Sequence, residues 1–238
     1  MYEPRYIDLF DYLLFDLQGT LMFGGDRLEE TTAFARTYRM LGGTRLSDEE
    51  VGMIFHDLLP TMWRLFNDPA AIESFPRFSD LLRGHPFGGL LDDDERALLD
   101  SVLALQELGT IDHEMGDLLR NLAVTHRLGI VSDLWGSSAV ARDYLAATGL
   151  AGLFTTMVFS SDHGAVKPSP ILLRRAYADF GTPPPYQVLC IGDSYERDIV
   201  AARAMGFATA LIDPARPPEP DFGDRVVASL EELRCIRQ

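Results

Sequence analysis

Short apolar segments recur along the chain, and each is bounded by polar residues or glycine. Such segments are typical of strands that are buried on both faces of a sheet. We therefore expect a strand at each of them. The segments are Tyr12–Phe15, Leu128–Val131, Thr156–Phe159, Val188–Ile191 and Ala208–Ile212.

Amphipathic segments of helical length lie in the intervals between the expected strands, one before each of the four strands from Leu128 onward. They are Met115–Thr125, Ser138–Ala147, Pro170–Phe180 and Asp198–Met205. Helix and strand therefore alternate through this part of the chain. The alternation predicts the α/β fold class, with a parallel sheet whose strands are joined by right-handed crossovers.

The interval between the first two expected strands is different, because its length of about 110 residues far exceeds what a crossover needs. It contains four helical patterns separated by breaks that contain glycine or proline. The patterns are Leu28–Tyr38, Asp48–Phe66, Ala70–Leu82 and Asp93–Leu108. We predict a helical cap domain over residues 22–109 and a single core domain formed by residues 1–21 and 110–238.

The charge balance limits the classes of partner. The chain carries 36 acidic and 21 basic residues, a formal net charge of −15. This excess of negative charge disfavours binding to nucleic acid or to an anionic membrane. Lys167 is the single lysine among the basic residues. An anionic substrate therefore has to be bound by local features of a site.

The remaining composition indicates a cytoplasmic protein. Cys190 and Cys235 do not form a disulfide framework, and they lack the spacing of a zinc or redox motif. The first residues are acidic where a secretory leader needs a basic start. No window approaches the roughly 18 apolar residues of a membrane span. We expect no nucleic-acid or membrane partner, and the sequence makes no prediction of oligomeric state.

Polar residues that are suited to catalysis or metal binding follow the expected strands. Because ligands of open parallel sheets bind beyond the carboxyl ends of the strands, we expect these side chains to converge on one edge. Clustered carboxylates repel one another without a cation, and oxygen ligands suit Mg²⁺. A lysine and a hydroxyl beside them fit the stabilisation of a phosphoryl group. The residues are Asp16, Ser132, Asp133, Lys167, Asp193 and Asp198.

Four motifs occur in order along the core segments, and together they resemble those of the haloacid dehalogenase-like (HAD) hydrolase superfamily. The resemblance is to the subgroup with a helical cap inserted after the first core strand. It implies a Rossmann-like parallel sheet and a hydrolase that acts on a small organic phosphate. The motifs are Phe15-Asp16-Leu17-x-Gly19-Thr20-Leu21, Ile130-Val131-Ser132, Gly164-x-x-Lys167-Pro168-x-Pro170 and Gly192-Asp193-Ser194-x-x-x-Asp198.

The resemblance also implies roles for individual residues. Asp16 is similar to the nucleophile that forms an aspartyl-phosphate, with Ser132 and Lys167 as the other catalytic residues. Mg²⁺ would be held by Asp16, Asp193 and the backbone carbonyl of Gln18. Asp198 and Ser194 would support the metal site without ligating the ion. Substrate binding falls to Gly19, Thr20, Ser132, Asp133 and Lys167.

Gln18 departs from the family pattern. Phosphatases of the family carry there an aspartate that serves as general acid and base, whereas an amide does not exchange a proton at neutral pH. Such a group typically contributes about 10²–10⁴-fold in rate. Altered chemistry, a catalytically weak protein that binds a phosphorylated ligand, and a laboratory substitution all stay open. Asp133 and His56 are candidate surrogates for the missing acid.

Two relatives that lack this aspartate offer other mechanisms. Proteins that resemble phosphonoacetaldehyde hydrolases use a cap lysine as a Schiff-base amine, and the expected cap here contains no lysine. That mechanism is excluded. The 2-haloacid dehalogenases of the family dispense with magnesium, whereas Asp193 is retained here, so dehalogenation is an alternative that is less favoured than phosphoryl transfer.

Overall fold

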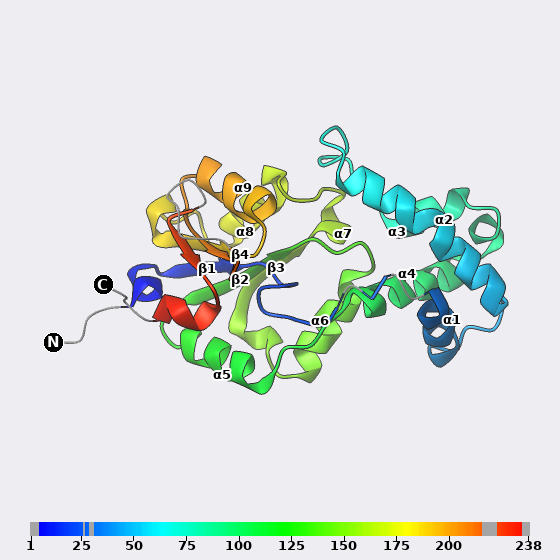
Figure 1. Cartoon of the computed structure of the whole chain (residues 1–238), viewed down its shortest axis with the longest axis horizontal. Helices are drawn as coiled ribbons and strands as arrows, with labels where there is room; N and C mark the ends of the chain where they lie inside the picture. Colours follow the sequence, from blue (N-terminus) through cyan, green and yellow to red (C-terminus); the bar gives the residue numbers. More distant parts are fainter. Residues whose placement is uncertain (1–4, 26, 29–30, 216–222, 235–238) are drawn as a thin grey trace.

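A six-stranded parallel sheet forms the centre of the structure, in the order β3-β2-β1-β4-β5-β6 (Figure 1). The computed structural model describes residues 5–25, 27–28, 31–215 and 223–234. The Rossmann-like α/β fold predicted from the sequence is thereby confirmed. The strands are β1 Tyr12–Phe15, β2 Arg127–Ser132, β3 Phe154–Phe159, β4 Val188–Gly192, β5 Ala208–Ile212 and β6 Arg225–Val227.

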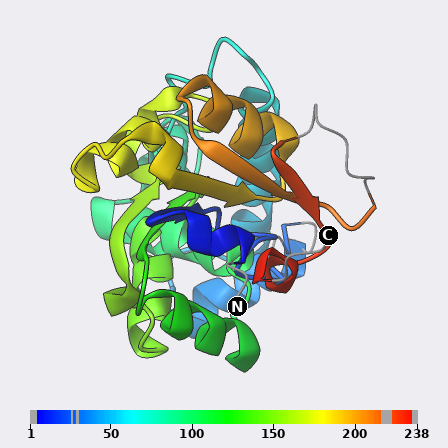
Figure 2. The ribbon, with the colours of Figure 1, turned by 90° about the vertical axis from the view of Figure 1, so that its left-hand side faces the viewer.

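Helices cover both faces of this sheet (Figures 1 and 2). Successive residues of β1 point to opposite faces, as the strand period of two requires. Leu13 and Phe15 belong to one apolar cluster, which includes residues of α5 and α6, whereas Leu14 belongs to another, which includes residues of α8 and α9. The helices are α5 His113–Leu122, α6 Ser138–Ala147, α8 Pro170–Asp179 and α9 Val200–Ala204.

Four further helices pack together on the side of the molecule beyond the carboxyl ends of the strands (Figure 1). They have a buried cluster of their own, in which the rings of Phe34 and Phe55 stack at 4.1 Å. Trp135 and Val166 of the sheet-bearing part join this cluster. The helical insertion thus packs against the core, and its domain boundaries stay a prediction. The helices are α1 Thr31–Met40, α2 Asp48–Phe66, α3 Phe78–Gly84 and α4 Asp93–Glu107.

Local sequence signals explain where α2 begins. Ser47 precedes the helix, and its Oγ accepts a hydrogen bond from the Glu50 backbone N–H at 3.2 Å. The Glu50 carboxylate in turn accepts from the Ser47 N–H at 2.7 Å. This reciprocal capping box satisfies two backbone donors that the first turn leaves without partners.

Two helix predictions were wrong in part. The expected helix Ala70–Leu82 is replaced at its start by tight turns from Asp68 to Ser74, and α3 begins only at Phe78. Pro76 explains the delay, since it has no N–H to donate and it forces the residue before it out of the helical region. The expected helix at Asp198 instead starts with a π-helical turn, Tyr195–Ile199, and α9 follows it.

The shorter elements lie mostly at the ends of strands and helices. β6 was missed from the sequence because it has only three residues and lies at the sheet edge, without a bounded apolar run. The short helical elements are Tyr6–Leu9, Gly88–Leu90, Ala151–Leu153, α7 Ser160–His163, Pro185–Gln187 and Leu230–Arg234.

No helix in the described parts of the chain is long and apolar enough to cross a membrane.

The order of the strands marks one place on the sheet for a ligand. β1 is paired with β2 on one side and with β4 on the other, so the chain reverses its direction of winding at β1. Phe15 is level with Ile130 of β2 and Ile191 of β4. The residues that follow these three strands therefore emerge together at the topological switch point, where open α/β sheets bind ligands.

Candidate active site

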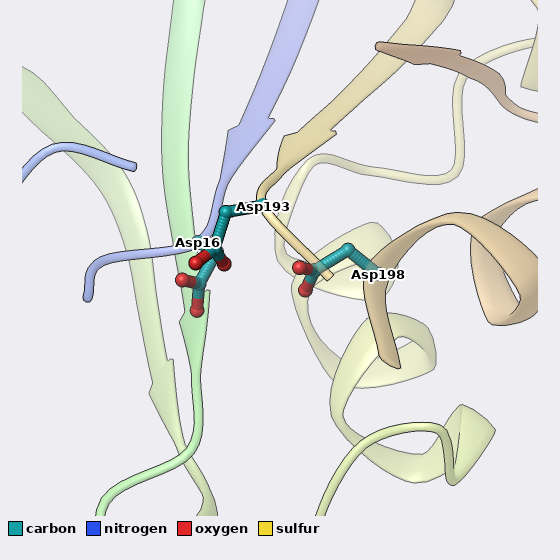
Figure 3. Close-up of side chains that lie close together, drawn as sticks. All are labelled: Asp16, Asp193 and Asp198. Atoms are coloured by element: carbon teal, nitrogen blue, oxygen red, sulfur yellow. The ribbon is translucent and has the colours of Figure 1, made fainter. Parts of the chain in front are cut away.

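Three carboxylates meet beyond the carboxyl ends of β1 and β4 (Figure 3). Asp16 follows β1, Asp193 follows β4, and Asp198 lies in the π-helical turn before α9. One oxygen from each lies within 4.8 Å of the others. Asp16 and Asp198 are buried, while Asp193 is exposed. The structure thus brings together three of the residues that the sequence placed at this edge.

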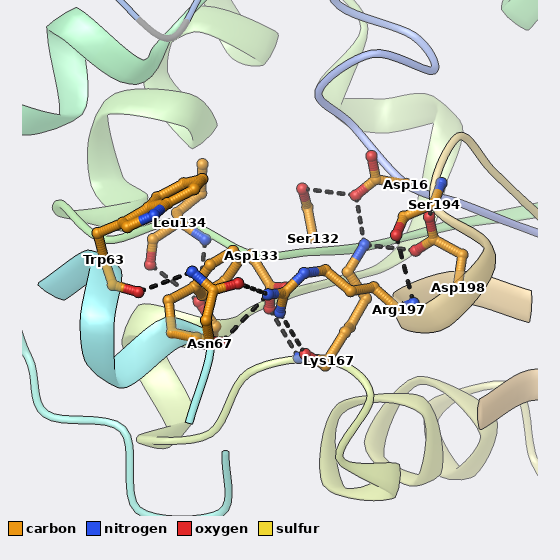
Figure 4. Close-up of polar contacts among 12 residues, drawn as sticks. Asp16, Trp63, Asn67, Ser132, Asp133, Leu134, Lys167, Ser194, Arg197 and Asp198 are labelled. Carbon is orange, nitrogen blue, oxygen red and sulfur yellow. Dashed lines mark hydrogen bonds and ion pairs between the residues drawn. The ribbon is translucent and has the colours of Figure 1, made fainter. Parts of the chain in front are cut away.

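Lys167 is the cation inside this cluster. Its Nζ donates to Asp16 Oδ1 and to Asp198 Oδ1, both at 2.6 Å, and the residue is only 4% exposed (Figure 4). Burial by itself lowers the pKa of Lys167, but the neighbouring Asp16 and Asp198 carboxylates raise it well above its usual value. The amine is therefore held as a fixed positive charge.

The two oxygens of Asp16 have different surroundings. Ser132 Oγ, at the end of β2, donates to Asp16 Oδ1 at 2.9 Å, and Lys167 donates to the same oxygen. Neither of these groups contacts Oδ2 within hydrogen-bonding distance. A carboxylate whose one oxygen is fixed by two donors can present the other in a defined direction.

The charge of the cluster fits a divalent cation. Although Asp193 is exposed as a residue, the surrounding protein desolvates its carboxylate and raises its pKa to about 7. The nearby Asp16 and Asp198 carboxylates add to this effect. Three carboxylates are balanced by one lysine, so negative charge remains in excess. Carboxylate oxygens are the ligands that Mg²⁺ takes in proteins, usually together with waters and substrate phosphate oxygens. The donor set of Asp16 and Asp193 is therefore compatible with Mg²⁺.

Gly19 allows the loop after β1 to lie against this cluster. Its φ is +74°, and a Cβ at this position would overlap the Asp193 carboxylate. Both features require glycine. Thr20, expected to bind substrate, is buried and lines a neighbouring cavity rather than the one that contains Asp16. Its Oγ1 has no hydrogen-bond partner among the described residues.

Gln18 is tied to the end of the helical insertion. Its Nε2 donates to the backbone carbonyl of Glu107, the last residue of α4, at 2.6 Å. The amide therefore links the loop after β1 to the point at which the chain returns to the core. In this position it supports the insertion and supplies no exchangeable proton.

Glu107 is a site residue that sequence reasoning missed. Its carboxylate is buried and accepts hydrogen bonds from the backbone N–H groups of Trp135 and Gly136, each at 2.7 Å. It thus connects α4 to the loop after β2. The available signal was its place at the end of the long insertion, but a glutamate at the end of a helix carries no specific pattern.

Arg197 is the second residue that was missed, although it lies inside the motif that ends at Asp198. Its guanidinium donates to the Lys167 carbonyl at 2.7 Å and to the Phe66 carbonyl at 3.1 Å, with Asn67 Oδ1 at 3.4 Å (Figure 4). It also lies over the Phe66 ring, 3.4 Å from its centroid. Arg197 therefore joins the segment that carries Asp193 and Asp198 to the end of α2.

Asp133 lines the same cavity as Asp16. Its Oδ1 accepts from the Lys167 N–H at 3.0 Å, while its Oδ2 is buried without a hydrogen bond, 3.9 Å from the Arg197 guanidinium. Burial raises the pKa of Asp133 to about 7, against the opposing effect of Lys167. His56, the other proposed surrogate acid, is exposed on α2 and does not line this cavity.

Ser194 shapes the turn that carries Asp198. Its Oγ accepts from the Arg197 N–H at 3.3 Å, and its own N–H donates to Asp198 Oδ2 at 3.0 Å. Because Asp198 Oδ1 accepts from Lys167, both oxygens of this carboxylate have protein partners. This geometry agrees with a supporting function for Asp198 and Ser194, which stays a prediction.

A cavity of about 810 Å³ opens above these groups. Its polar floor comes from the sheet-bearing part, and its opposite wall comes mainly from α2. That volume is in the range of small-molecule sites. The lining residues are Asp16, Gln18, Gly19, Leu28, Leu59, Pro60, Trp63, Phe66, Glu107, Ser132, Asp133, Trp135, Lys167, Asp193, Ser194, Arg197 and Asp198.

The fold and the site define a class of hydrolase in which a helical insertion covers carboxylates at the switch point of a Rossmann-like sheet. A family model described as haloacid dehalogenase-like hydrolase matches residues 10–206. The chain therefore belongs to the haloacid dehalogenase-like hydrolase family. The family resemblance stated from the four motifs is confirmed.

Two curated proteins are similar over part of the chain. The pyrimidine 5'-nucleotidase YjjG of Escherichia coli K12 is 30% identical over 121 residues, which are 50% of this chain and 53% of that protein. A phosphoserine phosphatase of Thermus thermophilus is 32% identical over 116 residues, 47% of this chain and 46% of that protein. The chain spans about half the length of the curated relatives that it matches.

Solved structures are similar over nearly the whole chain. A 2-haloacid dehalogenase from Pseudomonas syringae pv. Tomato has a TM-score of 0.64 at 21% identity, covering 94% of this chain and 96% of that one. The putative HAD hydrolase YfnB from Bacillus subtilis, bound to magnesium, has a TM-score of 0.58 at 24% identity with the same coverage. At these identities the likeness supports the fold alone.

Proposed function

We propose that this hydrolase transfers the phosphoryl group of a small organic phosphate to Asp16 and then to water, with Mg²⁺ as cofactor. The observation that carries the proposal is the pair of hydrogen bonds that Ser132 and Lys167 donate to Asp16 Oδ1, beside the Asp193 carboxylate. A fixed carboxylate next to a buried ammonium and an acidic cation site is suited to nucleophilic attack on an anion.

In the first step an oxygen of Asp16 forms a bond to phosphorus, and the bond from phosphorus to the leaving-group oxygen breaks with its electron pair on that oxygen. Lys167 and Ser132 donate hydrogen bonds to the phosphoryl oxygens as negative charge develops there. In the second step a water oxygen attacks phosphorus, the bond from phosphorus to the Asp16 oxygen breaks, and Asp16 is released as carboxylate. Both protons of the water end on oxygens of the phosphate product.

The metal site belongs to the same proposal. Asp16, Asp193 and the backbone carbonyl of Gln18 would hold Mg²⁺, which neutralises charge on the phosphoryl oxygens and orients them. Asp198 keeps Lys167 in place through the 2.6 Å ion pair. Asp193 stays charged more readily with a cation beside it, since its pKa is raised by burial and by its neighbouring carboxylates.

The test uses acetyl phosphate, whose leaving group needs no general acid. The Asp16→Asn variant is expected to lose at least about 10³-fold in phosphate release, because the nucleophile is gone. Mass spectrometry of acid-quenched wild-type protein is expected to find a phosphoryl adduct on Asp16. Turnover that survives in Asp16→Asn, or turnover without the adduct, would refute the mechanism.

A matched control is available on the same strand. Asp11 lies at the opposite end of β1 and is exposed, so Asp11→Asn changes the charge by the same amount without touching the site. Its activity on acetyl phosphate is expected to equal that of the wild type. The absence of phosphate release by all forms in the presence of Mg²⁺ would count against phosphoryl transfer.

The apolar wall of the cavity favours one second candidate, hydrolysis of a 2-haloacid. Leu59, Pro60 and Trp63 offer a surface for the alkyl group of such a substrate. In that reaction Asp16 attacks carbon and halide departs, so no cation is needed to bind a phosphoryl group. Halide release from 2-chloropropionate in the presence of a chelator would distinguish it, since the chelator should abolish phosphoryl transfer.

A further inference from the structure

The cavity has two chemically different halves. Its floor holds the carboxylates, Ser132 and Lys167, and its other half is an apolar wall. A phosphoryl group bound at the floor therefore points its leaving group toward side chains that carry no charge. The residues of the apolar wall are Leu28, Leu59, Pro60, Trp63, Phe66 and Trp135.

Aromatic rings dominate this wall. The centroids of Trp63 and Trp135 are 6.0 Å apart at an interplanar angle of 59°, and Phe66 lies 5.4 Å from Trp135 at 70°. Trp135 is 7% exposed, whereas Trp63 is 62% exposed. An indole that lies against a cavity with most of its surface uncovered offers a face on which a flat ring can pack.

Arg197 and Glu107, two charged residues that line the cavity beside the wall, are already engaged with the protein. Arg197 donates to the carbonyls of Lys167 and Phe66. The Glu107 carboxylate accepts from two backbone N–H groups. A leaving group with an ammonium, a carboxylate or several hydroxyls would lose water contacts here without gaining equivalent partners. The wall therefore selects against amino-acid and sugar phosphates.

The chemistry at position 18 points to the same class. The Gln18 amide donates to the Glu107 carbonyl and provides no proton for the leaving oxygen. A leaving group that departs without protonation must be a weak base, because proton donation matters most for basic leaving groups. Phenolates are much weaker bases than alkoxides, and their rings are flat and apolar.

On these grounds we propose that the substrates are aryl phosphates, monoesters of phosphate with an uncharged aromatic alcohol whose ring packs on Trp63 and Trp135. The inference rests on the proposed phosphoryl transfer at Asp16. It specifies the chemical class of the leaving group, which the residues at the floor of the cavity do not determine. Its support comes from the wall and from Gln18, which are separate parts of the site.

Binding can be tested without turnover, because the only two tryptophans in the sequence both line this cavity. Phenylphosphonate and methylphosphonate carry the same anionic group and are not hydrolysed. With Mg²⁺ present, phenylphosphonate is expected to change the tryptophan fluorescence. It is also expected to bind at least tenfold more tightly than methylphosphonate does. Equal affinities for the two phosphonates would overturn the inference.

Turnover gives the second test. The ratio of kcat/KM for phenyl phosphate to kcat/KM for acetyl phosphate is expected to fall at least tenfold in Trp63→Ala, mainly through KM. The control is Tyr186→Ala, which removes an aromatic residue that is 71% exposed and does not line the cavity. It should leave the ratio unchanged. An unchanged ratio in Trp63→Ala would contradict the assignment of the wall.

The outcomes separate this inference from the function on which it rests. Asp16-dependent hydrolysis of acetyl phosphate with no preference for aryl phosphates would refute the substrate class and leave phosphoryl transfer standing. The absence of Asp16-dependent hydrolysis of either compound would refute phosphoryl transfer itself, and the aryl phosphate assignment with it.

Discussion

Position 18 shows how one side chain can exchange a chemical role for a structural one. A carboxylate at this place would be a general acid, whereas the longer Gln18 amide reaches the carbonyl at the end of α4. The site keeps Asp16, Lys167 and the Asp193 carboxylate, the residues that the proposed phosphoryl transfer requires. What it lacks is an acid at position 18 itself, where the amide carries no proton to donate to a leaving oxygen.

Restoring the acid is expected to change the substrate range. Gln18→Asp should raise kcat/KM for an alkyl phosphate by about 10–100-fold, because a general acid assists a basic leaving group, and should change it much less for 4-nitrophenyl phosphate. Steady-state phosphate release measures both. Gln18→Asn is the matched control, since it shortens the side chain equally without adding an acid. A similar gain in Gln18→Asn would trace the effect to the lost contact with Glu107.

Asp133 is expected to make stability depend on pH. Burial raises its pKa from 3.8 to about 7, so the native state binds this proton more tightly than the unfolded chain does. Its contribution to stability is therefore lost as the pH rises through this interval. Asp133→Asn should gain on the order of 1–3 kcal/mol relative to wild type between pH 5 and pH 8.

Urea unfolding of the metal-free protein at the two pH values measures this difference. Asn keeps an oxygen that can accept from the Lys167 N–H, so the hydrogen bond is preserved. Asp48→Asn, at an exposed carboxylate on α2, is the control and should show no comparable trend. A constant difference between Asp133→Asn and wild type at both pH values would contradict the assigned shift.

At the scale of elements, α2 and the loop before α9 are held together by one side chain. Arg197 connects the carbonyl at the end of α2 to the carbonyl of Lys167, and Asn67 in turn donates to the Trp63 carbonyl at 2.8 Å. The position of the apolar wall is thus coupled to the loop that carries Asp193 and Asp198.

Removing this link is expected to loosen the insertion over the site. In Arg197→Gln, amide hydrogen exchange in the segment 66–71 should accelerate by about tenfold or more, because hydrogen bonds from a charged donor contribute about 1.5–3 kcal/mol. KM should rise more than kcat falls. Hydrogen exchange with mass spectrometry measures the first effect. Arg64→Gln, at an exposed arginine of α2, should leave both unchanged.

The elements also show where sequence reasoning succeeds. The strands were predictable because both faces of a parallel sheet are buried, which leaves continuous apolar runs such as Val188–Ile191. The residues of the acidic cluster follow those runs directly in the chain. Gln18 and Glu107, in contrast, are 89 positions apart, and their contact depends on how the insertion packs on the core. No local pattern encodes that packing.

At the scale of the whole molecule, a chain with a net charge of −15 gathers three carboxylates around its single lysine, Lys167. Carboxylates that are crowded without a cation cost stability, as the raised pKa of Asp193 indicates. Ligands that bind only the native state raise its stability by mass action.

Mg²⁺ is therefore expected to raise the melting temperature by a few degrees at saturation, and a chelator should reverse the shift. Asp193→Asn should abolish this response and, in metal-free protein, should melt higher than wild type because one crowded charge is gone. Differential scanning fluorimetry measures both. Asp48→Asn serves again as the control, and a full Mg²⁺ response in Asp193→Asn would argue against this ligand.

The burial of Lys167 has a consequence for the covalent chemistry of the protein surface. Because the chain has one lysine and that residue is 4% exposed within two ion pairs, no lysine amine is available on the exterior to acylating or cross-linking reagents. Modification of a lysine in this protein would therefore report the opening of the acidic cluster itself, at a single reactive position.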